Sequence, residues 1–356
     1  MDSVKIDGKI YDAESLTSLL KSEAFLDLPL WRQNIFTFLA AWWQSAESIE
    51  QYTSGSTGKA KPIQLAKRAM LASARRTCAF FHISEVSRLA LCLSAEYIAG
   101  KMMLIRALVS GAELLTIAPE GNPHRKFSDD IDFVAMVPLQ AENMLRDIGY
   151  TVRVKTVLLG GAEVSAPLRE LILACPETEF YLGYGMTETC SHVALQKIGV
   201  DDIYRGLPGV EFACDERGCL VVEDGEVVGQ ALISNDMAAL CAGGFRWLGR
   251  WDNIINSGGI KFSPEELESR IVHLLDYPFL LTSSPDSRLG RKIILVIESA
   301  DIYYLSRSKQ DLFRKKMCLM LAEVLDKYAL PRQIIYVSQL VRTASGKVDR
   351  RFIYSL

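Results

Sequence analysis

Short apolar runs alternate with amphipathic segments through the first half of the chain. Five runs are predicted to be buried strands: Leu89–Leu93, Leu114–Ile117, Phe133–Val137, Thr156–Leu159 and Glu179–Leu182. The segments between them have helical periodicity: Met70–Phe80, Met102–Val109, Leu139–Asp147 and Pro167–Ala174. This alternation is typical of an α/β fold with a mainly parallel sheet, and such sheets bind ligands at the carboxyl ends of their strands.

Two other segments depart from this alternation. Residues 14–48 are predicted to be helical, and they include a Trp-rich stretch from Trp31 to Trp43. Packing of this stretch in the core is the interpretation that we favour, and a homodimer contact is the alternative. Between residues 206 and 248, glycines punctuate short Val-rich runs, which indicates antiparallel strands.

The C-terminal part has the pattern of a small α+β unit. Ser263 is a good helix N-cap, and Pro264 suits the first turn of a helix. Further elements are predicted at Lys292–Ile297 (strand), 309–327 (helix) and Gln333–Val337 (strand). We therefore predict an α/β protein with two domains. Residues 1–249 form a large domain with a mainly parallel sheet and a β-rich subdomain, and residues 250–356 form a small, mobile α+β domain.

The composition is that of an ordinary globular protein, since 49% of the 356 residues are hydrophobic and 23% are charged. A net charge of −3 provides no basic field, which argues against nucleic acid or an anionic membrane as a partner. The longest apolar region, Tyr97–Ala118, is interrupted by Lys101, Arg106 and Glu113 and is too broken for a transmembrane helix. The eight cysteines include no Cys-x-x-Cys pair. With no recognisable signal peptide, the chain is predicted to be a reduced, cytoplasmic protein.

The segment Tyr52–Lys61 has the composition of an anion-binding loop, with two glycines, four hydroxyl residues and two lysines. Backbone N–H groups can approach a phosphate closely at glycines, and the hydroxyls add donors. A plain polar linker is the alternative interpretation. The P-loop of nucleotide hydrolases is a poor match, because only two residues separate Gly55 from Gly58 and Ala60 follows Lys59.

This segment resembles the phosphate loop of the adenylate-forming superfamily, which includes the acyl-CoA and aryl-CoA synthetases and usually has Pro where Ala60 stands. Further stretches match motifs of that family in the expected order: Gly183–Thr189, Ser234–Asp236, Gly249–Lys261 and Arg342–Arg350. The family usually has a much longer region before the phosphate loop, so we expect a compact member. The resemblance implies an enzyme that uses ATP, Mg²⁺ and coenzyme A.

The chemistry of Gly183–Thr189 makes sense by itself. The Thr187 hydroxyl can bond a phosphoryl oxygen, and the Glu188 carboxylate can hold Mg²⁺ against a triphosphate. The Tyr184 ring, next to Gly185, can lie on an adenine ring. We therefore expect Thr187 and Glu188 to take part in catalysis, with Glu188 as the metal ligand.

The resemblance implies roles for the other motif residues. The phosphates of ATP would be held by Thr53, Ser54, Gly55, Ser56, Thr57, Gly58 and Lys61. Asp236 and Arg250 would contact the ribose, and Asp252 would be the hinge between the domains. Lys261 would lie near the nucleotide or coenzyme A, and the catalytic Lys347 would reach the adenylation site. Small residues at Gly160, Gly161 and Ala162 would allow a ring close to the backbone.

Several details resemble the o-succinylbenzoate–CoA ligases of menaquinone synthesis. These are the run Arg250–Asn253 followed by Ser257–Gly259, and the arrangement of Gly100–Met103, Arg106 and Gly111. Many relatives carry His in the substrate loop where this chain has Tyr97. We therefore expect no His-dependent gate at this position.

The expected acid is a dianion, so one carboxylate must be held while the other reacts. Lys101 and Arg106 are the candidate cations, with snorkelling from an apolar helix as the alternative. Ser191 and His192 are candidate polar contacts to the substrate, with a structural role for the histidine as the alternative. Tyr97 completes the predicted substrate residues.

The sequence therefore predicts an ATP-dependent ligase that forms an acyl-adenylate and then a CoA thioester, with o-succinylbenzoate as the expected acid. Three alternatives stay open at this point. The acid can be another carboxylate, the acceptor can be a carrier-protein thiol, or the chain can be a non-catalytic nucleotide-binding relative.

Overall fold

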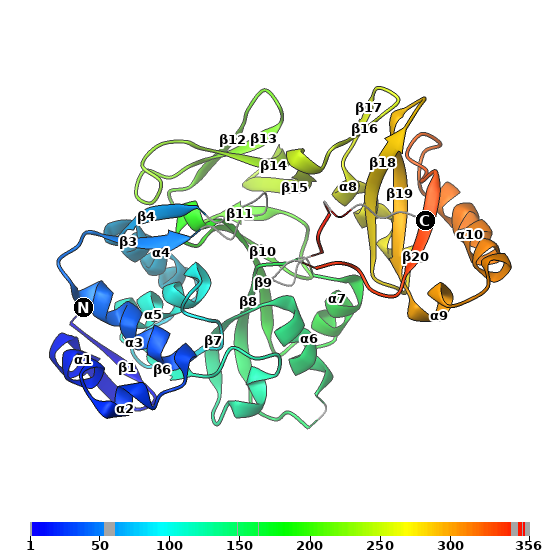
Figure 1. The fold of residues 1–356 in the computed structure, drawn as a ribbon. Coiled ribbons are helices and arrows are strands. Elements are labelled where there is room, and N and C mark those ends of the chain that lie inside the picture. The colour runs from blue at the N-terminus through cyan, green and yellow to red at the C-terminus, as the bar shows by residue number, and fades with distance from the viewer. Residues whose placement is uncertain are drawn as a thin grey trace. The chain divides into compact units, whose positions relative to one another are not determined.

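The computed structural model describes residues 2–52, 61–147, 149–162, 164–342, 348–350 and 352 (Figure 1). The chain divides into two units. Unit 1 contains Met1–Ala213, Val222–Leu232 and Cys241–Phe245, and unit 2 contains Cys214–Val221, Ile233–Leu240 and Arg246–Leu356. The division passes several times through the strands between residues 211 and 250. The domain boundary that we expect between residues 249 and 250 stays a prediction.

Five parallel strands form the middle of the unit 1 sheet, and all five are predicted from the sequence. They are β5 (Arg88–Leu91), β6 (Glu113–Thr116), β7 (Ile131–Met136), β8 (Val154–Leu159) and β9 (Glu179–Gly185). Their order in the sheet is β9-β8-β7-β5-β6, and every pair of neighbours is parallel. The predicted α/β fold with a mainly parallel sheet is confirmed.

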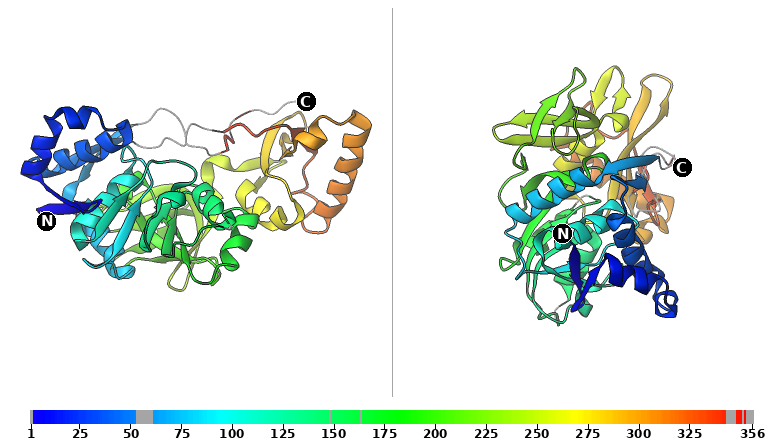
Figure 2. Two further views of the ribbon diagram at one scale, coloured as in Figure 1. Left: turned by 90° about the horizontal axis from the view of Figure 1, so that it is seen from below. Right: turned by 90° about the vertical axis from the view of Figure 1, so that its left-hand side faces the viewer.

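Helices cover both faces of this sheet (Figures 1 and 2). They are α4 (Lys67–Phe80), α5 (Ile98–Ser110), α6 (Pro138–Arg146) and α7 (Ala166–Leu173). Successive side chains of a strand point to opposite faces, and the core follows that alternation. On β7, Phe133 and Ala135 belong to the core that includes α4 and α5, whereas Val134 and Met136 belong to the core that includes α6 and α7.

The prediction that residues 14–48 are helical is wrong in detail. It contains α1 (Ala13–Leu20), α2 (Glu23–Leu26) and α3 (Leu30–Trp43), and strand β3 begins at Ser48. Pro29 separates α2 from α3, because a proline ring disfavours helical backbone at the preceding residue. Helix α3 buries Ile35, Phe36, Phe38, Leu39 and Trp42, which confirms core packing of the Trp-rich stretch.

An N-terminal hairpin that the sequence analysis missed extends the sheet. Strand β1 (Ser3–Ile6) pairs in parallel with β6, and β2 (Lys9–Asp12) pairs antiparallel with β1. Asp7 and Gly8 form the turn with φ values of 48° and 78°. Asp-Gly between two alternating runs is a strong hairpin signal and could have located this element.

Eight further strands lie among the described residues of the first 250 positions. They are β3 (Ser48–Tyr52), β4 (Pro62–Ala66), β10 (His192–Lys197), β11 (Tyr204–Gly206), β12 (Glu211–Cys214), β13 (Cys219–Glu223), β14 (Leu232–Cys241) and β15 (Gly244–Arg250). Two 3₁₀ helices, η1 (Pro123–Lys126) and η2 (Thr187–Thr189), lie in loops. Four of these strands, β12 to β15, lie in the region where the glycine pattern indicates β structure.

The C-terminal part of unit 2 has a sheet in the order β17-β16-β19-β18, with β20 paired to β19. Its elements are η3 (Trp251–Asn253), β16 (Ile255–Ser257), β17 (Ile260–Phe262), α8 (Pro264–Ile271), η4 (Val272–Leu274), β18 (Phe279–Asp286), β19 (Gly290–Glu298), α9 (Ala300–Tyr303), α10 (Arg307–Ala322) and β20 (Gln333–Val337). Ser263 caps α8 and accepts a hydrogen bond from the Glu266 N–H at 3.3 Å, as predicted. Among the described residues, no helix is long and apolar enough to cross a membrane.

Candidate active site

The loops that follow the parallel strands of unit 1 carry most of the predicted site residues. The register pairs Leu91 with Ala135, Met136 with Leu159, and Leu159 with Leu182, so the carboxyl ends of these strands lie along one edge of the sheet. Tyr97, Gly161 with Ala162, and Thr187 with Glu188 follow β5, β8 and β9 respectively. Residues that are far apart in the sequence therefore share the edge where such sheets bind ligands.

The loop after β9 that contains Thr187 and Glu188, here called the Thr-Glu loop, is stabilised by hydrogen bonds within the loop. The Thr189 hydroxyl accepts from the Met186 N–H at 2.9 Å, and it lies 2.7 Å from the Ser191 carbonyl oxygen as a donor. A Cβ added to Gly185 would lie 2.2 Å from that carbonyl oxygen, so only glycine fits there. Thr187 is buried and Glu188 is exposed, which leaves the Glu188 carboxylate available to a cation.

The Tyr184 ring belongs to an aromatic group in unit 1. Its centroid lies 5.0 Å from that of Phe245 and 5.9 Å from that of Tyr204, and both pairs are edge-to-face. Gly183, the preceding residue, would bring an added Cβ within 3.1 Å of His192 Cβ. The tyrosine is half-buried, and its neighbours restrict the orientation of the ring.

Arg106 is the most unusual charged side chain of unit 1. It is 1% exposed, and its Nη2 donates to Ser191 Oγ at 2.6 Å while Nη1 lies 3.4 Å from Met103 Sδ. Its Nε has no acceptor, and no carboxylate of the described residues pairs with it. Burial lowers the pKa of the guanidinium to about 10. The snorkelling alternative is wrong for Arg106, because its charge lies inside the protein.

A buried charge without a counter-ion is unfavourable, so an anion bound beside Arg106 would stabilise the folded chain. A guanidinium has five N–H donors, and only two of those of Arg106 have acceptors among the described residues. The free donors suit a carboxylate, which accepts two parallel hydrogen bonds from one guanidinium edge.

Ser191 and His192 lie directly against this arginine. Ser191 Oγ is 3.2 Å from His192 Nδ1, and His192 Nε2 is 3.4 Å from Thr77 Oγ1 on α4. Burial, and then the charge of Arg106, lower the pKa of His192 well below its usual range, so the imidazole is neutral. Thr77 is fully buried, and the sequence carries no signal that distinguishes it from an ordinary core threonine.

Lys101 lies five residues before Arg106 on α5 and is half-buried. Its Nζ donates to Gln51 Oε1 at 2.5 Å and lies 5.7 Å from the centroid of the Phe38 ring. Burial lowers the pKa of Lys101, and the nearby Glu96 opposes that shift. Gln51, which the sequence analysis missed, holds this ammonium group and also donates to the Glu96 carbonyl oxygen at 3.2 Å.

The other predicted residues of unit 1 are exposed. Tyr97 is 59% exposed at the N-cap of α5, and Lys61, Gly161 and Ala162 are also exposed. Gly161 has a φ of 84°, which a residue with a side chain rarely adopts. The backbone after β8 is therefore exposed, and the expected contact with a flat ring stays a prediction.

In unit 2, the predicted ribose and hinge residues lie together. Arg250 Nη2 donates to Asp252 Oδ2 at 2.8 Å, and Arg250 Nε lies 3.8 Å from Asp236 Oδ1. Asp236 also accepts from Trp247 Nε1 at 3.3 Å, and Asn235 lies 3.4 Å from both carboxylate oxygens of Asp252. The two carboxylates can accept hydrogen bonds from a diol, and the guanidinium can donate to its oxygens.

Lys261 stacks on an aromatic ring in the same unit. Its Nζ lies 4.8 Å from the centroid of Trp251, and the guanidinium carbon of Arg217 lies 5.9 Å from that centroid. Both are cation–π contacts, which hold a cation in place without neutralising its charge. Lys261 is exposed and can therefore meet an anionic ligand.

Several predicted residues lie outside the described part of the chain. These are Thr53, Ser54, Gly55, Ser56, Thr57, Gly58 and Lys347. Their roles stay predictions. Within the described residues, no group of three or more His, Cys, Asp or Glu side chains could hold a metal ion. A magnesium ion held by one carboxylate and by nucleotide phosphates needs no such group.

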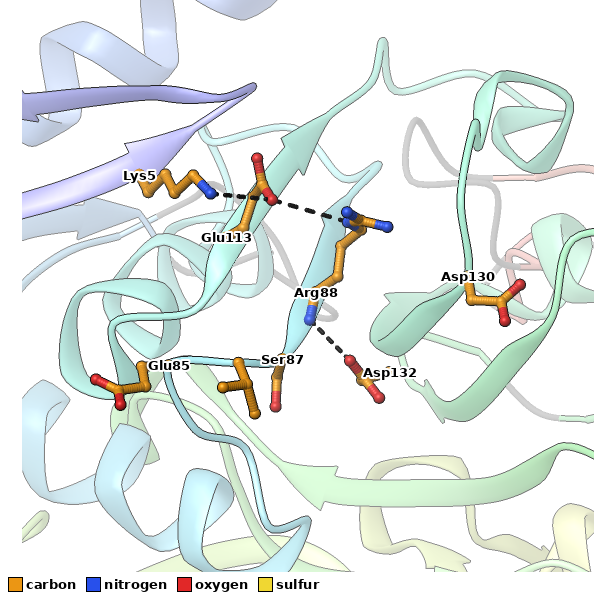
Figure 3. Close-up of a pocket in the computed structure, with 8 residues that line it drawn as sticks. Lys5, Glu85, Ser87, Arg88, Glu113, Asp130 and Asp132 are labelled. Carbon is orange, nitrogen blue, oxygen red and sulfur yellow. Dashed lines mark hydrogen bonds and ion pairs between the residues drawn. The ribbon is translucent and has the colours of Figure 1, made fainter.

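A hollow of about 450 Å³ in unit 1 lies at the other edge of the sheet (Figure 3). It is lined by residues at the amino ends of β5, β6 and β7, including Arg88, Glu113 and Asp132. Lys5 Nζ lies 3.3 Å from Glu113 Oε2, and the Arg88 N–H donates to Asp132 Oδ2 at 2.8 Å (Figure 3). Glu113 pairs with both lining cations, Lys5 and Arg88, and the hollow contains none of the predicted site residues.

Comparisons with known proteins agree with this picture. A family model described as AMP-binding enzyme matches residues 45–240. The crystal structure of an acyl-CoA synthetase (AMP-forming)/AMP-acid ligase II-like protein from Dyadobacter fermentans is 31% identical, with a TM-score of 0.61 over 95% of this chain and 96% of that one.

Curated relatives with specific names are more distant. The 2-succinylbenzoate–CoA ligases of Escherichia coli and Salmonella typhimurium are 28% and 27% identical over 73% and 72% of this chain. The match spans 60% of the length of each of these relatives. The o-succinylbenzoate coenzyme A synthetase of Bacillus subtilis, solved with ATP and magnesium, is 22% identical with a TM-score of 0.67 over 85% of this chain and 68% of that one, which shows a shared fold.

Proposed function

The chain belongs to the family of AMP-binding enzymes, and we propose that it is an ATP-dependent acid–thiol ligase that joins a carboxylic acid to coenzyme A. The acid carboxylate attacks the α-phosphorus of ATP, which gives an acyl-adenylate and releases pyrophosphate. The thiol of coenzyme A then attacks the acyl carbon, which gives the thioester and releases AMP. The ordered motifs between residues 52 and 350 and the names of the relatives support this activity.

We propose o-succinylbenzoate as the acid, and the buried Arg106 is the observation that carries this proposal. The guanidinium has free donors and no carboxylate partner among the described residues. A dianionic acid would supply that partner with one carboxylate and react with the other. The names of the 2-succinylbenzoate–CoA ligases agree with such an acid.

The first step concentrates negative charge on phosphoryl oxygens, so it requires positioned cations and donors rather than a strong base. We assign the Thr187 hydroxyl to the α-phosphate and Lys347 to the charge of the transition state. The exposed Glu188 carboxylate fits Mg²⁺, which would neutralise charge on the phosphates. The predicted phosphate loop, Thr53–Gly58 with Lys61, would hold the β- and γ-phosphates.

The nucleotide also requires contacts to its base and ribose. Tyr184, fixed edge-to-face against its aromatic neighbours, would lie on the adenine, next to the backbone of Gly185. The exposed backbone of Gly161 and Ala162 would line the same pocket. The carboxylate of Asp236 and the guanidinium of Arg250 would bind the ribose hydroxyls.

The second step is assigned to a turn of residues 250–356 about Asp252, after which Lys261 would meet coenzyme A. The same pocket could then serve two reactions. Tyr97 and Lys101 would border the acid on the side where β5 ends.

Mass spectrometry of complete reactions tests this proposal. The protein is incubated with ATP, Mg²⁺ and coenzyme A, and with o-succinylbenzoate, benzoate, a medium-chain fatty acid or no acid. The proposal predicts AMP and the o-succinylbenzoyl thioester, with little product from the other acids. Thioester from another acid alone would overturn the substrate. AMP or adenylate without a thioester would shift the acceptor to a carrier-protein thiol, and no AMP with any acid would contradict the activity.

A further inference from the structure

A connected set of polar side chains extends from Arg106 into the core of unit 1. Arg106 Nη2 donates to Ser191 Oγ at 2.6 Å, Ser191 Oγ lies 3.2 Å from His192 Nδ1, and His192 Nε2 lies 3.4 Å from Thr77 Oγ1. Thr77 Oγ1 in turn donates to the Ser73 carbonyl oxygen at 3.0 Å, one turn earlier on α4. The set joins α5, the residue before β10, the first residue of β10, and α4.

Only one arrangement of protons satisfies every member of this set. Ser191 Oγ accepts from Arg106, so its own proton is free for His192 Nδ1. Nδ1 must then be unprotonated, and Nε2 carries the imidazole proton. Nε2 donates to Thr77 Oγ1, whose proton goes to the Ser73 carbonyl oxygen. In the opposite tautomer, Nε2 would accept a hydrogen bond from the Thr77 hydroxyl. The Ser73 carbonyl oxygen would then lose its hydrogen bond from that hydroxyl.

The protonated imidazole does not fit the same set. It would place a second positive charge beside Arg106 in the buried core, where charges repel more strongly than in water. His192 is 6% exposed and Thr77 is fully buried, so bulk solvent screens that repulsion only weakly. The set is therefore compatible with one tautomer of neutral His192.

We propose that Thr77 is a positioning residue: it selects the tautomer of His192, which orients Ser191 as the acceptor that holds the Arg106 guanidinium for the second carboxylate of the acid. This inference deepens the proposed function and rests on it for the role of Arg106. It also changes the expected roles of Ser191 and His192. They act through the arginine rather than by contact with the acid.

The proposal predicts a defined effect of the Thr77 hydroxyl. Thr77→Val keeps the shape of the side chain and removes the hydroxyl, whereas Thr77→Ser keeps the hydroxyl. We expect Thr77→Val to raise KM for o-succinylbenzoate about three- to tenfold, the usual value of one buried hydrogen bond, with kcat nearly unchanged. Thr77→Ser is expected to restore KM. Ser73→Ala is the matched control on the same helix, because the Ser73 hydroxyl has no hydrogen-bond partner among the described residues.

A spectroscopic measurement separates this proposal from a merely structural effect. Nitrogen-15 NMR of histidine-labelled protein reports which ring nitrogen of His192 carries the proton, and it requires neither substrate nor turnover. We expect the Nε2–H tautomer in the native protein, in Thr77→Ser and in Ser73→Ala, and its loss in Thr77→Val. The assignment of the His192 signal comes from a His192→Gln variant.

The outcomes separate the relay from the activity. An Nδ1–H tautomer in the native protein overturns the proposal, even if Thr77→Val fails to fold. An unchanged tautomer in Thr77→Val overturns it, and so does an unchanged KM where the tautomer is lost. If no acid is turned over, the proposed function fails, and the tautomers alone then decide whether Thr77 orders this set.

Discussion

At the scale of single residues, Arg106 shows a conflict between ligand binding and folding stability. A guanidinium that is 1% exposed and unpaired with any described carboxylate weakens folding in the absence of a ligand. The resemblance to the family located this residue. Its burial could not be predicted from the sequence, because arginine side chains usually lie at the protein surface. Gln51 and Thr77 were missed for the related reason that their importance depends on contacts 50 and 115 positions away.

Replacement of Arg106 by Met therefore has opposite effects on stability and on specificity. We expect Arg106→Met to raise the free energy of unfolding by about 1–3 kcal/mol, since an apolar side chain removes the buried charge. KM for o-succinylbenzoate should rise about 100-fold, the cost of one lost ion pair in a water-free site. Urea unfolding and steady-state kinetics measure the two effects.

The matched substrate for this variant is 4-oxo-4-phenylbutanoate, which keeps the keto acid chain and lacks the carboxylate on the ring. The native protein should use it poorly, and Arg106→Met should use it no worse. An equal loss with both acids would mean that Arg106 does not read the second carboxylate.

His192 gives the protein a defined sensitivity to acid. Its pKa in the folded state lies well below the usual 6.5, so the unfolded chain binds a proton that the native chain does not as the pH falls below that value. Stability is therefore lost as the pH falls, by about 1–2 kcal/mol between pH 6.5 and pH 5. His192→Gln should flatten this part of the curve of unfolding free energy against pH. His273→Gln, at an exposed site, is the control, and parallel curves for native protein and His192→Gln would refute the assignment.

At the scale of elements, the parallel strands and their helices were the most predictable part of the fold. The run Phe133–Val137 corresponds to β7, and Gln333–Val337 matches β20 residue for residue. Both are short, continuous apolar runs, which is the pattern of a buried strand. The helical prediction for residues 14–48 was wrong where it ignored Pro29, and the hairpin at Asp7 and Gly8 was missed although its turn signal was present. The Thr-Glu motif predicted the position of one loop, but the hydrogen bonds within that loop could be seen only in the structure.

The turn between β9 and η2 depends on the absence of a side chain at Gly185. We expect Gly185→Ala to destabilise the protein by about 2–3 kcal/mol, because its Cβ would lie 2.2 Å from the Ser191 carbonyl oxygen and the loop must shift. Adenylate formation should fall with it, since Thr187 and Glu188 lie on that loop. Gly225→Ala, where an added Cβ meets nothing within 4 Å, is the control. A Gly185→Ala protein as stable and active as the control would show that the loop tolerates the shift.

At the scale of the whole molecule, the two units carry different parts of the predicted machinery. Unit 1 holds Arg106 and the Thr-Glu loop, and unit 2 holds Asp236, Arg250 and Lys261. The order of the motifs could be read from the sequence, whereas the division of the chain between residues 211 and 250 could not, because its strands pass repeatedly from one unit to the other.

Separate measurements of the two half-reactions test the proposed roles of the C-terminal lysines. Lys347→Ala should lower acid-dependent exchange of pyrophosphate into ATP at least about 100-fold, since it removes a charge from the transition state. Lys261→Ala should leave that exchange nearly unchanged and slow thioester formation from added acyl-adenylate. The reverse pattern would exchange the two roles, and no effect of either variant would contradict both.

The central claim is that the acid is activated as an acyl-adenylate, and an oxygen-18 transfer experiment tests it most directly. The protein is given o-succinylbenzoate with ¹⁸O in both carboxylates, together with ATP, Mg²⁺ and coenzyme A, and the AMP is analysed by mass spectrometry. Attack of a carboxylate oxygen on the α-phosphorus predicts one ¹⁸O in the phosphate of every AMP released with a thioester. AMP without the label, or ADP as the product, would contradict the account.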